Sequence, residues 1–125
     1  CLGDPRLFLS RLSLLCVQGF ADPRGLSRLL LGGAPHTTAS VSINGLEVLA
    51  QLDTRQALQA FRGPQLHLFA GLDGLVPAEA AQDLLKLLPD VEIGLIERAG
   101  HAFLVEDPHG VAGAIQAFFH EFSDD

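Results

Sequence analysis

The sequence predicts an α/β fold, and three observations support this. Two short apolar segments, residues 64–71 and 91–97, have proline or glycine close to each end, which is typical of buried strands. A helical pattern follows each of them, at 77–89 and 108–122, and a connection of this length joins parallel strands. The first 62 residues carry mostly short helical patterns. Parallel strands are buried on both faces, and these elements are too few to bury two of them, so we expect the sheet to continue outside this sequence.

Two helix-start signals stand in the first 33 residues. Asp4-Pro5 and Asp22-Pro23 each place a helix-capping residue before a proline at the first helical position. Gly19 can end the first of these helices, and Gly32-Gly33 can end the second. We therefore expect two short helices joined by a tight turn.

The spacing of apolar residues predicts the remaining helices. The polar segment 34–42 predicts a connector, residues 43–53 predict a helix, and 54–63 predict a short helical turn. The helix at 108–122 is expected to turn one apolar side inward. The residues on that side are Val111, Ile115, Phe118, Phe119 and Phe122.

Composition indicates a globular chain, and it excludes several classes of protein. The chain is 48% hydrophobic and 18% charged, which is too apolar for a disordered chain. No stretch of 18 uncharged apolar residues is present, and no signal-peptide pattern, so we expect no membrane partner. Cys1 and Cys16, without a CxxC spacing, make neither a disulfide framework nor a zinc site, and a reducing cytoplasm is the default location.

The charge of the chain is uneven. The net charge is −7, with about +2 on residues 1–62 and about −9 on residues 63–125. The acidic second half argues against nucleic acid as a partner. The mildly basic first half fits either a solvated helix face, which is the simpler interpretation, or a surface for an acidic partner.

Asp73 and His101 each follow one of the expected strands. Asp73 lies in the loop after 64–71, and His101 lies in the loop after 91–97. The carboxyl ends of parallel strands meet at one edge of a sheet, about 5 Å apart for neighbours, so the two side chains should lie within reach of each other. A carboxylate that accepts a hydrogen bond from imidazole fixes its tautomer and stabilises the imidazolium, as in a nucleophilic triad.

Each of these residues also has a simpler explanation. An Asp-Gly pair after a strand is usually a turn, and a lone histidine is usually structural. Their matching positions at two strand ends favour the acid–base interpretation. The other histidines, which have no comparable placement, are His36, His67, His109 and His120. No His, Asp or Glu cluster has the spacing of metal ligands.

The nucleophile of a triad is not visible. An α/β-hydrolase orders its triad as nucleophile, acid and histidine, with the nucleophile serine in a G-x-S-x-G turn. No serine of this chain has flanking glycines at that spacing, and Cys16 lies within a helical pattern. We therefore expect the chain alone to be inactive, although its acid and histidine are in the order of a carboxylic-ester hydrolase.

The segments "GLDGLVP" (71–77) and "AGHAFLVEDP" (99–108) resemble the C-terminal half of the α/β-hydrolase superfamily. Within it, "NGLEVLAQLDTRQAL" (44–58) is similar to the biotin-pathway carboxylesterases that act on pimeloyl-[acyl-carrier protein] methyl ester. The resemblance implies a partial α/β-hydrolase fold. Residues 1–53 would be a helical cap, or lid, and residues 54–125 the C-terminal part of the core.

The same resemblance implies the roles of individual residues. Asp73 would be the triad acid and His101 the general base. The cap residues Leu14, Leu15, Cys16, Val17 and Gln18 would line the acyl channel. Arg24 and Arg28 would engage an acidic acyl carrier protein. The substrate would be an ester, the missing N-terminal half of the core would supply the serine, and no metal or organic cofactor is implied.

Two departures from the family pattern are present, and three alternatives stay open. "AGHAF" stands where "AGHAP" is commoner in the family, and the segment that would carry the nucleophile is not in this sequence. Other superfamily members, such as carbon–carbon bond hydrolases, haloalkane dehalogenases and acyltransferases, share the acid and the histidine. A truncated, non-catalytic binding module and one half of a split enzyme are the further alternatives.

Overall fold

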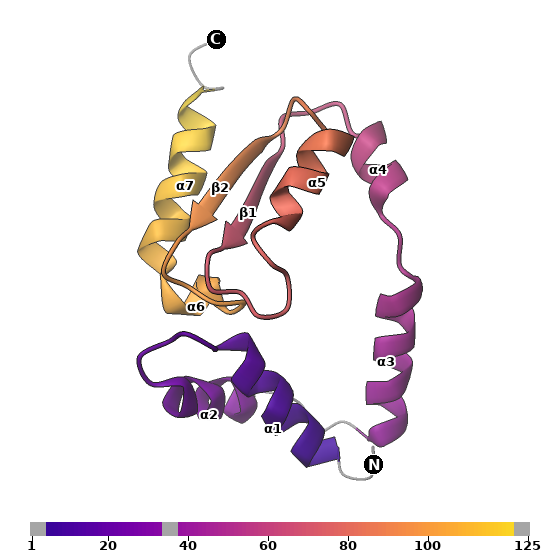
Figure 1. Cartoon of the computed structure of the whole chain (residues 1–125), viewed down its shortest axis with the longest axis vertical. Coiled ribbons are helices and arrows are strands. Elements are labelled where there is room, and N and C mark those ends of the chain that lie inside the picture. Colours follow the sequence, from indigo (N-terminus) through magenta and orange to yellow (C-terminus); the bar gives the residue numbers. More distant parts are fainter. Residues whose placement is uncertain (1–4, 34–37, 122–125) are drawn as a thin grey trace.

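The structure is a computed structural model that describes residues 5–33 and 38–121 (Figure 1). It contains a helical first part and a second part in which helices and strands alternate. The elements are α1 (Pro5–Cys16), α2 (Pro23–Gly33), α3 (Ala39–Gln51), α4 (Arg55–Ala60), β1 (Leu66–Ala70), α5 (Ala80–Leu87), β2 (Glu92–Ile96), α6 (Phe103–Glu106) and α7 (Pro108–Glu121).

α1 and α2 pack against each other as a helical hairpin. Gly19, in the turn between them, has a φ of 99°, a left-handed conformation that glycine adopts without strain. Asp22 caps α2 as predicted, since its Oδ1 accepts a hydrogen bond from Gly25 N at 2.9 Å. The matching prediction at Asp4 lies outside the described residues.

A buried polar contact joins the two helices. The hydroxyl oxygens of Ser13 and Ser27 are 2.7 Å apart, and Ser13 also donates to the Ser10 carbonyl at 2.9 Å. Both serines are buried, as are Val17 and Leu26. Hydrogen bonds offset much of the desolvation free energy of a buried hydroxyl. The serine pair is therefore compatible with close packing of the hairpin.

α3 begins four residues earlier than the sequence pattern predicts. Thr38 caps it by accepting a hydrogen bond from Val41 N at 3.4 Å, so the predicted polar connector over 34–42 is wrong for residues 39–42. Residues 34–37 lie outside the described part. None of the residues of α3 is buried in the described chain, although several are large and apolar, namely Val41, Ile43, Leu46, Val48 and Leu49. α4 forms where the short helical turn is predicted.

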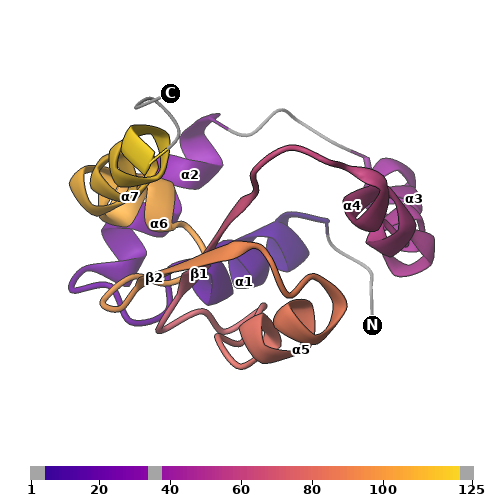
Figure 2. The ribbon, with the colours of Figure 1, turned by 90° about the horizontal axis from the view of Figure 1, so that it is seen from above.

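β1 and β2 form a parallel pair, as the sequence predicts. Their register runs from Leu66 opposite Glu92 to Ala70 opposite Ile96. α7 and α5 lie on opposite sides of this pair (Figure 2). The buried cluster below α7 comprises Ala70, Ile96, Ala99 and Val111, with Leu68 and Phe103 packed against it. The chain therefore has an α/β architecture, because helices alternate with two parallel strands.

The inward side of α7 differs from the predicted one. Val111 is buried and Phe118 is partly buried, but Ile115 is 39% exposed and Phe119 is 62% exposed. At 3.6 residues per turn, positions 111, 114 and 118 share one narrow face, whereas 115 and 119 rotate progressively away from it. Phe119 instead packs edge to face on Phe118, with ring centroids 5.9 Å apart. Phe122 lies outside the described residues.

Two smaller differences concern the loops after the strands. α5 spans Ala80–Leu87, so the predicted helix at 77–89 is too long at both ends. The short helix α6, a segment for which the sequence pattern predicts no element, begins two residues after His101. Within the described ranges, no helix has the length and apolar character needed to cross a membrane.

We predict that Gly71→Ala destabilises the chain by about 1–3 kcal/mol. Gly71 N donates to Ile96 O at 3.0 Å, and a Cβ at this position would overlap the carbonyl oxygen of Glu97. Backbone atoms directly after a paired strand cannot move aside as a flexible side chain would. Urea unfolding of the wild-type protein and the variant measures the change in the free energy of unfolding.

Gly113→Ala is the matched control for this prediction. A Cβ at Gly113 meets no atom within 4 Å, and the position is exposed on α7. Alanine there should stabilise the helix by about 0.5–1 kcal/mol. Equal effects of the two substitutions would show that the contact between residues 71 and 97 is not tight.

Candidate functional site

Asp73 lies in the loop that follows β1, and its carboxylate accepts three hydrogen bonds. Oδ1 accepts from Leu75 N at 2.8 Å and from Val76 N at 3.0 Å, a local turn that aspartate favours. Oδ2 lies 2.9 Å from His101 Nδ1. The side chain is 5% exposed. Burial alone would raise the pKa of Asp73, but the hydrogen bonds from Val76, Leu75 and His101 together hold it below its usual value, so the carboxyl is ionised at neutral pH.

His101 follows β2, and its ring is 41% exposed. With Asp73 ionised, Nδ1 carries the hydrogen that is donated to Oδ2. The neutral ring then presents Nε2 as a proton acceptor. The predicted closeness of Asp73 and His101 is confirmed. A histidine oriented in this way can accept a proton from a third group, while the carboxylate stabilises the resulting imidazolium.

The backbone on both sides of His101 is held by hydrogen bonds. Gly100 N donates to Glu106 Oε2 at 2.7 Å, and Ala102 N donates to the Cys16 carbonyl at 3.0 Å. A Cβ at Gly100 would lie 2.9 Å from the Gln18 carbonyl oxygen, so only glycine lets the end of α1 approach this closely. The turn that carries the histidine is therefore attached both to α6 and to the first helical hairpin.

The structure brings the predicted channel segment, residues 14–18, close to the loops of Asp73 and His101. Besides the two carbonyl contacts at Gly100 and Ala102, Gln18 Oε1 lies 2.9 Å from the place of a Cβ on Gly74. Val17 is completely buried, whereas Leu14 and Leu15 are exposed. The contribution of these five residues to an acyl channel stays a prediction.

Cys16 is a poor candidate for the missing nucleophile. Burial raises the pKa of its thiol, and the negative charge of Asp73 raises it further. The thiolate is the reactive form of cysteine, and catalytic cysteines lie in electropositive surroundings that lower the pKa. The environment of Cys16 does the opposite.

Arg24 and Arg28 are exposed on α2, one turn apart. The residues between them that face inward are Leu26 and Ser27, which are buried. The helix thus has one face packed in the hairpin and one that carries two guanidinium groups to solvent. Their role in binding a partner stays a prediction.

Glu106 is a site residue that the sequence reasoning missed. It lies on α6, its Oε2 holds the Gly100 amide, and its Oε1 is buried without a hydrogen-bond partner in the part of the chain that the structure describes. The only signal in the sequence is an acidic residue five positions after His101, which is too weak to assign a role.

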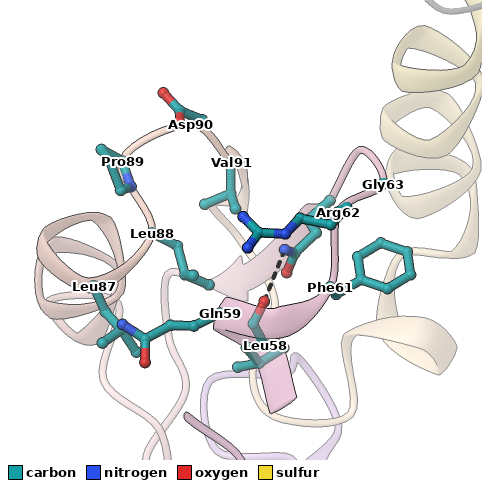
Figure 3. A pocket seen from close by; sticks show the side chains of 11 residues that line it. Leu58, Gln59, Phe61, Arg62, Gly63, Leu87, Leu88, Pro89, Asp90 and Val91 are labelled. Carbon is teal, nitrogen blue, oxygen red and sulfur yellow. Dashed lines mark hydrogen bonds between the residues drawn. The ribbon is translucent and has the colours of Figure 1, made fainter. Parts of the chain in front are cut away.

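A separate pocket lies at the opposite end of the strands (Figure 3). It has a volume of about 350 Å³, and it is lined by residues of the 58–65 and 87–91 segments, which precede β1 and β2. A hydrogen bond from Gln65 Nε2 to the Leu58 carbonyl at 3.2 Å crosses it. Each strand has five residues, so about 16 Å of strand separates this pocket from the Asp73–His101 edge, and the two do not form one site.

Within residues 5–33 and 38–121, no group of three or more His, Cys, Asp or Glu side chains could hold a metal ion. His67 is paired with Gln65 Oε1 at 3.1 Å, and His109 and His120 lie exposed on α7. His36 lies outside the described residues.

We predict that the stabilisation by the Asp73 charge is lost in acid. A carboxyl whose pKa is lowered in the folded state stabilises the fold above its unfolded pKa, and this contribution disappears as the pH falls through the folded pKa. Urea unfolding of the wild type and of Asp73→Asn should therefore show a gap that narrows as the pH is lowered below about 4. A gap that widens toward low pH would mean that the folded state does not hold Asp73 ionised.

The chain is similar to proteins of biotin biosynthesis. No family model matches it. It is 44% identical over 109 residues to the pimeloyl-[acyl-carrier protein] methyl ester esterase of Vibrio cholerae, which covers 84% of the chain and 43% of that protein. It is 38% identical over 96 residues to the enzyme of the same name from Cronobacter sakazakii, covering 77% of the chain and 37% of that protein.

A longer match joins the chain to a larger protein. It is 33% identical over 121 residues to the biotin biosynthesis bifunctional protein BioHC of Teredinibacter turnerae, covering 94% of the chain and 21% of that protein. The chain thus spans less than half of the length of each of these relatives.

Proposed function

We propose that this chain supplies the acid and the base of a serine carboxylesterase. Most of its length is homologous to part of the pimeloyl-[acyl-carrier protein] methyl ester esterases of biotin biosynthesis. The observation that carries the proposal is the contact of 2.9 Å between Asp73 Oδ2 and His101 Nδ1 at the carboxyl ends of two parallel strands. An acid–histidine pair in this position is what a triad requires of its last two members.

The geometry supports a two-step hydrolysis. A serine hydroxyl outside this sequence loses its proton to His101 Nε2 as its oxygen attacks the ester carbonyl. The imidazolium returns the proton to the departing alcohol, which leaves an acyl-serine. His101 then takes a proton from water as the water oxygen attacks the acyl carbonyl, and it returns this proton to the serine oxygen when the acyl–serine bond breaks, which releases the acid. Asp73 keeps the ring in the required tautomer and stabilises its positive charge in both steps.

The proposed fold is the C-terminal part of an α/β-hydrolase. Residues 1–53 would form the helical cap, and residues 54–125 the last two β–α units of the core. The parallel register of β1 and β2, with α5 and α7 on opposite sides, supports this assignment. The remaining strands and the serine would come from residues outside this sequence, which would extend the sheet beyond the β1–β2 pair.

The proposed substrate is an ester carried by acyl carrier protein. The names of the relatives suggest the methyl ester of a pimeloyl group. Leu14, Leu15, Cys16, Val17 and Gln18 would line the channel for its apolar chain, since the end of α1 lies against the loops of the acid and the base. Arg24 and Arg28 would meet the acidic carrier, because both guanidinium groups are exposed on one helix.

A chimera tests the catalytic roles. In this chimera, the 125 residues take the place of the matching segment of the Vibrio cholerae esterase. The rest of that esterase supplies the remaining part of the enzyme. We expect hydrolysis of a p-nitrophenyl ester, and a fall in kcat of about 10³–10⁴-fold with His101→Ala or Asp73→Asn. His109→Ala, an exposed histidine of α7, is the matched control and should leave kcat unchanged.

Two results would contradict the proposal. A chimera that is active but insensitive to His101→Ala would assign the base elsewhere. The 125 residues alone should show no turnover, because they hold no serine in a nucleophile turn. Turnover by the chain alone that His101→Ala abolishes would require a nucleophile within it.

A second variant tests the carrier surface. Replacing both Arg24 and Arg28 by glutamate in the chimera should lower kcat/KM for the carrier-linked methyl ester by about tenfold or more, because two attractive contacts become repulsive. The same variant should leave turnover of the p-nitrophenyl ester unaffected. An equal loss with both substrates would show that α2 supports the fold and does not bind the carrier.

A further inference from the structure

We propose that Glu106 is a positioning residue for the His101 base: it holds the Gly100 amide and thereby fixes the turn that aims the histidine at its targets. The inference rests on the proposed function, since it names a further member of the same site. It assigns Glu106 no contact with substrate.

The contact that supports the inference is short and specific. Glu106 Oε2 accepts from Gly100 N at 2.7 Å, in the range of hydrogen bonds with a charged partner. Gly100 is buried and directly precedes His101. Because Ala102 N is held on the other side by the Cys16 carbonyl at 3.0 Å, the two bonds leave the backbone of His101 little freedom.

The placement of Glu106 has an energetic cost. Its Oε1 is buried and has no hydrogen-bond partner among the described residues, and an unsatisfied buried oxygen is unfavourable. Burial raises the pKa of Glu106, the Gly100 hydrogen bond lowers it in part, and the charge of Asp73 raises it again. The hydrogen bond from Gly100 N to Oε2 is the contact that offsets this cost.

Two substitutions separate the acceptor from the charge. Glu106→Gln keeps an oxygen that can accept from Gly100 N and removes the negative charge. Glu106→Ala removes both. If the carboxylate acts through the Gly100 amide, glutamine should restore what alanine loses.

Asp107→Ala is the matched control. Asp107 is the next residue along the chain, and its Oδ1 accepts from Gly110 N at 2.9 Å at the start of α7. Its loss removes the same kind of hydrogen bond in the same region without touching Gly100. It should lower stability and leave kcat unchanged.

The experiment compares the wild-type protein with the three variants. We measure esterase kcat and KM, amide hydrogen exchange at Gly100 and the low-field NMR resonance of the His101 Nδ1 proton. With Glu106→Ala we expect kcat to fall about tenfold to a hundredfold at nearly constant KM. Exchange at Gly100 should quicken about tenfold or more relative to Asp107→Ala, and the Nδ1 resonance should weaken. Glu106→Gln should return all three close to the wild type.

Unchanged exchange at Gly100 in Glu106→Ala would overturn the inference, as would a loss of kcat with Glu106→Gln equal to that with alanine. A loss of kcat with Asp107→Ala equal to that with Glu106→Ala would reduce the role to general stability and also overturn it. Absence of turnover in the wild type would count against the proposed function alone. The exchange and NMR measurements would then still decide whether Glu106 fixes the His101 turn.

Discussion

The parallel register of β1 and β2 is the constraint on which the site depends. Ala70 lies opposite Ile96, so both strands end at the same level and the two following loops leave the sheet side by side. Asp73 is three residues beyond one strand end, and His101 is five beyond the other. A shift of one residue in either strand would move its side chains to the other face and separate the carboxylate from the imidazole. The close packing of Gly71 against Glu97 helps to exclude such a shift.

The two carboxyl groups near His101 are in contrasting environments. Asp73 is nearly buried, yet three donors surround it, and their combined effect keeps it ionised. Glu106 is partly buried with one donor, and its ionisation is disfavoured. The first arrangement stabilises a positive charge on the imidazole. The second holds the backbone amide of Gly100.

The apolar surface of the described residues is consistent with a part of a larger core. Leu95 in β2 is 51% exposed, although parallel strands are normally covered on both faces. The apolar residues of α3 are also exposed, and this helix makes few contacts with the rest of the chain (Figure 1). These exposed apolar surfaces support the proposal that residues outside this sequence complete the fold.

The sequence by itself determined the strands, the parallel pairing and the closeness of Asp73 and His101, because these follow from local patterns and from one topological rule. Proline and glycine bounded the apolar runs, and the carboxyl ends of parallel strands share an edge. The inward face of α7 and the contact between Glu106 and the Gly100 amide were decided only by the tertiary structure. Each depends on which surface is near in space. Ile115 and Phe119 look as apolar as Val111, but only packing against β1 and β2 distinguishes them, and nothing local shows that a glutamate five residues after a histidine folds back to hold the amide before it.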